Sequence, residues 1–144
     1  YAHIAHDCIV GDDNVFANNA GIAGHVRIGN NVTIGAFTTI HQFCQMGDYS
    51  FAGMNSSITM DVPAYIKVAS NPARVIGLNS VGMERGGIDK EIITIVKKGY
   101  KTVYRKGLNL RDAIKKLESM SSSDVKEIQN FINSLKSSER GILR

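Results

Sequence analysis

The four histidines of the chain, His3, His6, His25 and His41, all fall within its first 41 residues. Near physiological pH a neutral imidazole can act as a base, a metal ligand or a hydrogen-bond partner. His6 is followed by Asp7, a carboxylate that could orient it. Two chemistries are therefore open: His6 as a general base that takes a proton from a hydroxyl, or a zinc site built from three histidines.

Whether these side chains meet depends on a repeat of six residues. From position 4 to position 58 every sixth residue is apolar, and in eight of the ten steps the next residue is Ala or Gly. The apolar positions are Ile4, Val10, Phe16, Ile22, Ile28, Ile34, Ile40, Met46, Ala52 and Ile58. Neither an amphipathic helix nor a hairpin has this period. It predicts a β-solenoid with triangular coils of eighteen residues, one inward apolar side chain per side, and the small residue at each bend.

Eighteen residues per coil bring the histidines to one edge of this solenoid. Asp7 then stacks with His25, and Gly24 lies between His6 and Gln42. The four histidines occupy five successive positions of the coil, which favours a functional site over scattered surface residues. The same arithmetic places Cys8 and Cys44 two coils apart, about 10 Å, which is too far for a disulfide.

Three segments are predicted: coils over residues 1–60, a linker with short extended segments over residues 61–88, and a domain of three helices over residues 89–144. Apolar residues recur with a helical period from Asp89 to Gly107 and from Leu110 to Met120. A third helix is expected to begin within residues 121–124. The chain starts in the middle of a repeat without an initiator Met, so further N-terminal coils are expected to precede it.

Basic residues are unevenly distributed along the chain. Residues 1–60 hold only one of the 17 basic residues, so the helical part is strongly basic and could dock an acidic partner. No run of 18 apolar residues suggests a membrane span. Unpaired cysteines and the lack of a visible export signal favour the cytoplasm. Nucleic acid is not an expected partner.

Several strings at these positions resemble one family, the UDP-N-acetylglucosamine acyltransferases of lipid A synthesis. They are Ala2-His3-Ile4-Ala5-His6-Asp7-Cys8, Ala23-Gly24-His25-Val26, His41-Gln42-Phe43-Cys44, Gly77-Leu78-Asn79 and the terminal Arg140-Gly141-Ile142-Leu143-Arg144. The resemblance implies a left-handed parallel β-helix, a homotrimer with active sites between subunits, and no cofactor or catalytic metal. It also implies the reaction: an R-3-hydroxyacyl group passes from acyl carrier protein to the 3-hydroxyl of UDP-N-acetylglucosamine.

The resemblance assigns roles to individual residues. His6 matches the general base, Asp7 its acidic neighbour, and the backbone N–H of Gly24 the group that stabilises the thioester oxyanion. The remaining matches concern substrate binding: His25, His41 and Gln42 hold the nucleotide sugar or the acyl group, His3 is on the substrate side, and Asn79 and Arg85 lie near the uridine diphosphate. Met54 departs from the family, because members that take long acyl chains often have Gly at this position, and we therefore expect it to limit acyl-chain length.

Three other functions remain open at this point. The first is the related N-acyltransferase of the same pathway, although the strings around His6 and His41 favour the O-acyl enzyme. The second is a metal-binding β-helix protein resembling γ-carbonic anhydrase, which stoichiometric zinc would support. The third is an inactive scaffold fragment that binds neither the nucleotide sugar nor acyl carrier protein.

Overall fold

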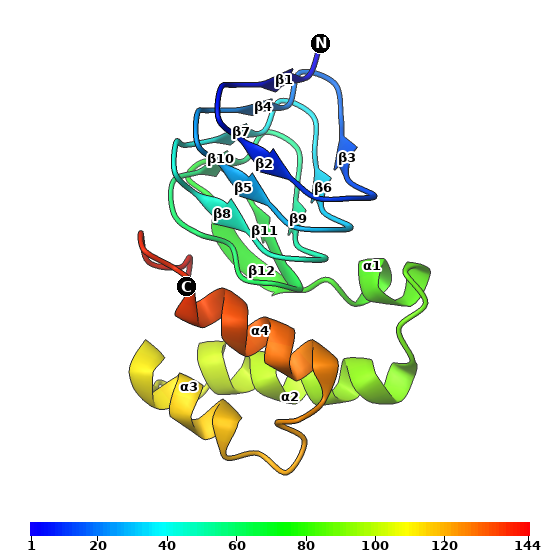
Figure 1. Cartoon of the computed structure of the whole chain (residues 1–144), viewed down its shortest axis with the longest axis vertical. Helices are drawn as coiled ribbons and strands as arrows, with labels where there is room; N and C mark the ends of the chain where they lie inside the picture. The colour runs from blue at the N-terminus through cyan, green and yellow to red at the C-terminus, as the bar shows by residue number, and fades with distance from the viewer.

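A computed structural model describes residues 1–144 and shows a β-solenoid standing on a group of helices (Figure 1). Each side of each coil contributes one two-residue strand. The strands are β1 (His3–Ile4), β2 (Ile9–Val10), β3 (Val15–Phe16), β4 (Gly21–Ile22), β5 (Arg27–Ile28), β6 (Thr33–Ile34), β7 (Thr39–Ile40), β8 (Gln45–Met46), β9 (Phe51–Ala52) and β10 (Ser57–Ile58). The six-residue period therefore corresponds to one strand and one turn, as predicted.

The strands pair in parallel with a constant offset of one coil. His3 pairs with Gly21, and Gly21 pairs with Thr39. Three sheets result: β1-β4-β7-β10, β2-β5-β8, and a third that contains β3-β6-β9. This register confirms the coil of eighteen residues and the stacking of Asp7 with His25.

The inward apolar positions form the core of the solenoid. From Ile22 to Ile58 these side chains are buried, and Ile34 is fully inaccessible. Ile4 and Val10 carry the same pattern but are exposed, because β1 and β2 are the first strands of their sheets and no coil covers them.

The small residues serve a different purpose from the one predicted. The sharp turns occur two residues later, at non-glycine residues in the left-handed region, with φ of 58° at Asp7 and 61° at His25. The glycines instead lie where adjacent coils come closest. A Cβ placed on Gly35 would lie 2.6 Å from the backbone nitrogen of Met54. A larger side chain would therefore push neighbouring coils apart.

The segment predicted to be a linker contains regular structure. Strand β11 (Ile66–Ala69) continues the third sheet in parallel with β9, and β12 (Arg74–Leu78) pairs antiparallel with β11. A short helix α1 (Ser80–Arg85) follows, with the Asn79 side chain accepting a hydrogen bond from the Gly82 N–H as its N-cap. Parallel pairing thus extends past residue 60, and the helix was not predicted.

Three longer helices complete the chain. They are α2 (Lys90–Tyr104), α3 (Leu110–Glu118) and α4 (Lys126–Lys136), and α4 lies between the base of the solenoid and α2 (Figure 1). Phe131 and Leu117 are fully buried where the three helices pack. None of the helices is long and apolar enough to cross a membrane.

The last residues return to the solenoid and fasten the helices to it. The buried carboxylate of Asp61 accepts hydrogen bonds from the Gln45 backbone N–H at 2.8 Å and from the Ser138 hydroxyl at 2.6 Å. The backbone of Asp61 also bonds to Gly141 and Leu143. These bonds fix residues 137–139 beside the face formed by β2, β5 and β8.

Both cysteines are free, as predicted. Cys44 is buried, and burial raises the pKa of its thiol to about 11. At neutral pH this thiol is therefore protonated and unreactive.

Candidate functional site

One corner of the solenoid carries a column of three side chains with the same backbone conformation. Asp7, His25 and Phe43 follow one another at one-coil intervals, with φ of 58°, 61° and 66°. Each coil holds the next through its backbone, since the His25 N–H donates to the His6 carbonyl at 3.0 Å and the Phe43 N–H to the Gly24 carbonyl at 3.2 Å. The side chains are thus presented from a rigid backbone.

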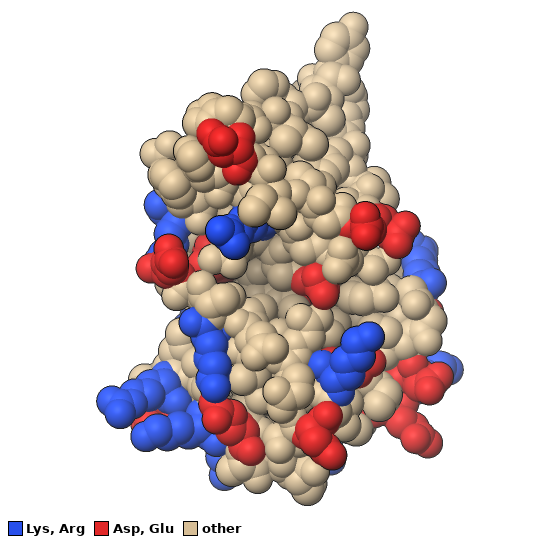
Figure 2. All heavy atoms as spheres, viewed as in Figure 1, with Lys and Arg blue, Asp and Glu red and all other residues tan.

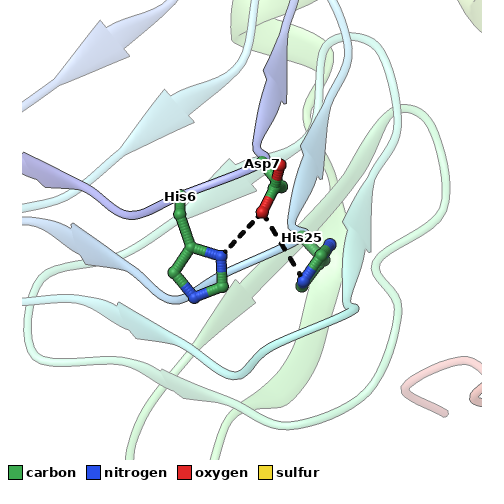
Figure 3. Close-up of side chains that lie close together, drawn as sticks. All are labelled: His6, Asp7 and His25. Carbon is green, nitrogen blue, oxygen red and sulfur yellow. Dashed lines mark hydrogen bonds and ion pairs between the residues drawn. The ribbon is translucent and has the colours of Figure 1, made fainter.

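Two imidazoles converge on a single oxygen of Asp7 (Figure 3). The Nδ1 of His6 lies 2.9 Å from Asp7 Oδ2, which is a hydrogen-bond distance. The Nε2 of His25 lies 3.8 Å from the same oxygen. The imidazole rings of His6 and His25 meet edge to face, with centroids 5.1 Å apart.

These contacts favour a charged Asp7. The hydrogen bond from His6, and then the positive potential of His25, lower the pKa of the Asp7 carboxyl below its usual value. Asp7 is therefore a permanent anion at neutral pH. Its hydrogen bond to His6 places the imidazole proton on Nδ1 and leaves the Nε2 of His6 as the basic nitrogen.

Gly24 lies directly against the imidazole of His6. A Cβ added to Gly24 would be 2.6 Å from His6 Cε1 and 2.7 Å from Nε2, so no other residue fits without moving the ring. The N–H of Gly24 donates no hydrogen bond to any other group of the protein. Gly24 thus combines a backbone N–H that is free of protein partners with a close approach to the imidazole of His6.

Phe43 belongs to this corner, although the sequence analysis did not select it. Its ring stacks on the imidazole of His25 with centroids 4.7 Å apart and the planes only 6° from parallel. The position of Phe43 one coil after His25 was the available signal. It was overlooked because phenylalanine has no acid–base chemistry.

A cleft of about 550 Å³ opens next to the corner. Its solenoid wall includes Asp7, His25, Phe43 and Arg27, and its other wall is formed by residues 136–139 at the end of α4. Figure 2 shows the molecule hollowed where the solenoid meets the helices, on the face formed by β2, β5 and β8. A substrate could therefore reach Asp7 and His25 from this side.

Comparison with known proteins gives a consistent result along the whole chain. The family Udp N-acetylglucosamine O-acyltransferase, domain 2, matches residues 61–143, and bacterial transferase hexapeptide repeats match residues 7–42. The chain is 40% identical over 144 residues to the acyl-[acyl-carrier-protein]--UDP-N-acetylglucosamine O-acyltransferase of Thiobacillus denitrificans.

Solved structures agree with this result. LpxA from Acinetobacter baumannii superposes with a TM-score of 0.94 at 48% identity, over 99% of this chain and 55% of that one. The Moraxella catarrhalis enzyme gives 0.95 at 46% identity, with the same two coverages. The chain belongs to the UDP-N-acetylglucosamine O-acyltransferase family. It spans about half the length of the curated relatives that it matches, 55% in the case of the Thiobacillus denitrificans protein.

Three further residues that were predicted to bind substrate, His41, Gln42 and His3, lie near this corner but are not part of the group formed by His6, Asp7 and His25. His41 and Gln42 are exposed on the next coil, where His41 Nδ1 lies 3.1 Å from the Gln42 carbonyl oxygen. His3 is exposed on β1. Neither His3 nor His41 is among the groups that converge on Asp7.

Asn79 and Arg85 lie on a different face of the solenoid. They line a second cleft of about 450 Å³, together with Thr33, Phe51 and Lys67 of the third sheet and its flank. Arg85 is exposed, whereas Asn79 is 7% exposed and its Nδ2 donates to the Tyr49 carbonyl at 2.8 Å. Asn79 thus also positions α1. Met54, in turn, is 67% exposed on the solenoid surface.

His6, Asp7 and His25 could also hold a metal ion by spacing alone. One ligand atom from each lies within 4.8 Å of the others. This set has two histidines and one carboxylate, whereas the predicted zinc site needed three histidines. The contact between His6 and Asp7, at 2.9 Å, has the length of a direct hydrogen bond that needs no ion between the two side chains.

Proposed function

We propose that this chain carries the catalytic corner of an enzyme that transfers an R-3-hydroxyacyl group from acyl carrier protein to the 3-hydroxyl of UDP-N-acetylglucosamine. The arrangement of His6, Asp7 and Gly24 is the observation that carries the proposal. It combines a base, an anion that orients the base, and a free backbone donor within one small site.

His6 acts first, as the general base. Its Nδ1–H is held by Asp7, so the lone pair of Nε2 can take the proton of the sugar hydroxyl. The resulting oxygen nucleophile attacks the thioester carbonyl, and the protonated His6 then delivers that proton to the departing thiolate. Asp7 stabilises the imidazolium between the two steps, as an ionised carboxylate does beside a catalytic histidine.

The N–H of Gly24 stabilises the negative charge on the thioester oxygen during attack. A backbone donor that is not already bonded within the protein costs no reorganisation when the charge develops. The contact between Gly24 and His6 keeps the donor next to the proton carrier.

Binding of the substrates involves the remaining candidates. His3, His25, His41 and Gln42 are proposed to contact the nucleotide sugar or the acyl group. Asn79 and Arg85 are proposed to contact the uridine diphosphate, since a guanidinium suits a diphosphate. Because their cleft is on another face from the catalytic corner, a homotrimer would complete the site by placing one subunit's Arg85 near the His6 of its neighbour.

Acyl carrier protein is the proposed acidic partner of the helices. Four lysines, Lys98, Lys101, Lys106 and Lys116, line a groove of about 210 Å³ formed by α2, α3 and residues close to them. Their attraction to an acidic protein should be screened by salt. The catalytic efficiency is therefore expected to fall as ionic strength rises.

The decisive experiment mixes the chain with UDP-N-acetylglucosamine and R-3-hydroxyacyl carrier proteins of increasing acyl length. Mass spectrometry follows the acylated nucleotide. His6→Ala should lower turnover by about 10²-fold to 10⁴-fold. Asn18→Ala is the matched control, because Asn18 is an exposed residue just before the turn at another corner. A turnover of His6→Ala equal to that of Asn18→Ala would refute the role of His6 as the base.

The same panel tests Met54 as the residue that limits acyl length. Met54 is exposed, so an acyl chain lying along the solenoid could meet its side chain. Met54→Gly should shift the preference toward longer acyl groups. If Met54→Gly does not change the preferred acyl-chain length, Met54 does not limit that length.

Metal binding is the second candidate function, because three potential ligands do converge. It makes a different prediction: zinc at one equivalent per chain, and loss of activity on chelation. The acyltransfer proposal expects activity that survives treatment with a chelator.

A further inference from the structure

Phe43 is an exposed aromatic residue at the repeated left-handed turn. Its φ of 66° is close to that of other aromatic residues at these turns, 58° at Phe37 and 59° at Tyr49, so the backbone does not single it out. The ring is 53% exposed, so it contributes little to the core. Its close contact is the parallel stack on His25.

The imidazole that stacks on Phe43 is also the one that faces Asp7. Both imidazoles face the same carboxylate oxygen, but only His6 is within hydrogen-bond distance, at 2.9 Å against 3.8 Å for His25. For the Nε2 of His25 to approach further, the ring must turn or shift. A turn of the ring out of its plane, or a shift away from Phe43, weakens a stack whose planes are 6° from parallel.

We propose that Phe43 is a positioning residue that reserves Asp7 Oδ2 for His6 by holding the imidazole of His25 in place. Without the stack, His25 moves closer and donates to the same oxygen. The negative charge of that oxygen is then shared between two donors, so its hydrogen bond to His6 weakens and the Nδ1–H tautomer of His6 is less favoured. The inference rests on the proposed role of His6 as the base.

The kinetic test compares Phe43→Leu with Phe43→Tyr. Leu cannot stack, so kcat should fall about fivefold, with little change in the KM of the nucleotide sugar. Tyr keeps the ring and should restore kcat. Phe37→Leu is the matched control, because Phe37 is 55% exposed and sits at another corner with φ of 58°. An equal loss of kcat in Phe37→Leu would overturn the proposal.

A double-mutant cycle shows whether Phe43 acts through His25. In a His25→Asn background the stack is already gone, so Phe43→Leu should have no further effect on kcat. If the losses of kcat from Phe43→Leu and His25→Asn are additive, Phe43 does not act through His25.

Nitrogen-15 NMR of the imidazoles provides a readout that does not require activity. Phe43→Leu should shift the His25 signals and reduce the Nδ1–H tautomer of His6, whereas Phe43→Tyr should leave both unchanged. Unchanged spectra in Phe43→Leu would refute the positioning role. If the spectra change but His6→Ala remains active, the positioning role holds and the general-base function fails.

Discussion

Two corners of the solenoid have the same backbone conformation but carry different side chains. At one corner the left-handed positions hold Asp7, His25 and Phe43. At the corner that begins six residues later they hold Asp13, Asn31 and Tyr49. The values of φ are nearly the same, 57° at both Asp13 and Asn31 against 58° and 61° at Asp7 and His25. Asp and Asn tolerate this conformation well.

The second corner therefore uses its side chains mainly to hold the coils together. The Asn30 side chain next to Asn31 accepts a hydrogen bond from the Asp12 N–H, and Asp48 accepts one from the Asn30 N–H. At the first corner the corresponding positions are His6, Gly24 and Gln42, and no such ladder forms. The repeat sets the backbone at both corners, whereas the residues at positions 6, 24 and 42 leave the first corner without these hydrogen bonds between coils.

The largest effect expected from this comparison is that of Gly24→Ala. The new methyl would lie 2.6 Å from His6 Cε1, so the imidazole must leave Asp7 or the coils must separate. Either change would misalign the proposed base and the proposed oxyanion donor, and kcat should fall about 10²-fold to 10³-fold. Gly21→Ala is the control, because a Cβ at Gly21 meets nothing within 4 Å. Equal activity of the two variants would show that the contact between Gly24 and His6 has no catalytic role.

His25→Asn makes the first corner resemble the second. Asn favours the left-handed conformation, so the free energy of unfolding should stay the same or rise by up to about 1 kcal/mol. The imidazole next to Asp7 is lost, and kcat/KM should fall about 10-fold to 100-fold. The reverse change at the third corner, Asn19→His, should leave activity unaltered. Denaturant unfolding together with steady-state kinetics separates the two effects, and a parallel loss of stability and activity would argue against a functional His25.

Much of the difference between the two corners could be predicted from the sequence, because the spacing of residues along a solenoid determines which of them stack. The offset of eighteen residues was sufficient to stack Asp7 with His25 and to place Gly24 between His6 and Gln42. The rotation of side chains is not contained in the spacing, so the stack of Phe43 on His25 was missed. Asn79 was predicted only as a binding residue, because the helix that it caps has six residues and lacks a clear apolar period.

Asn79 and Arg85 both line the second cleft, but Asn79 is expected to affect stability and Arg85 substrate binding. Asn79→Ala removes the N-cap of α1 and the bond to the Tyr49 carbonyl, so the free energy of unfolding should fall by about 1 kcal/mol. Arg85→Ala should leave stability unchanged and raise the KM of the nucleotide sugar about fivefold. Thermal unfolding and kinetics measure both. An unchanged KM in Arg85→Ala would place the diphosphate elsewhere.

The smallest effect concerns the pH dependence of Asp7. Its pKa in the folded state is lowered by His6 and then by His25, so its charged form stabilises the fold. That contribution is present above the ordinary pKa of 3.8 and is lost as the pH falls through the lowered value. The difference in melting temperature between the protein and Asp7→Asn should therefore be constant near pH 7 and change only in strong acid. A difference in melting temperature that changes between pH 5 and 8 would contradict the assignment of this pH dependence to Asp7.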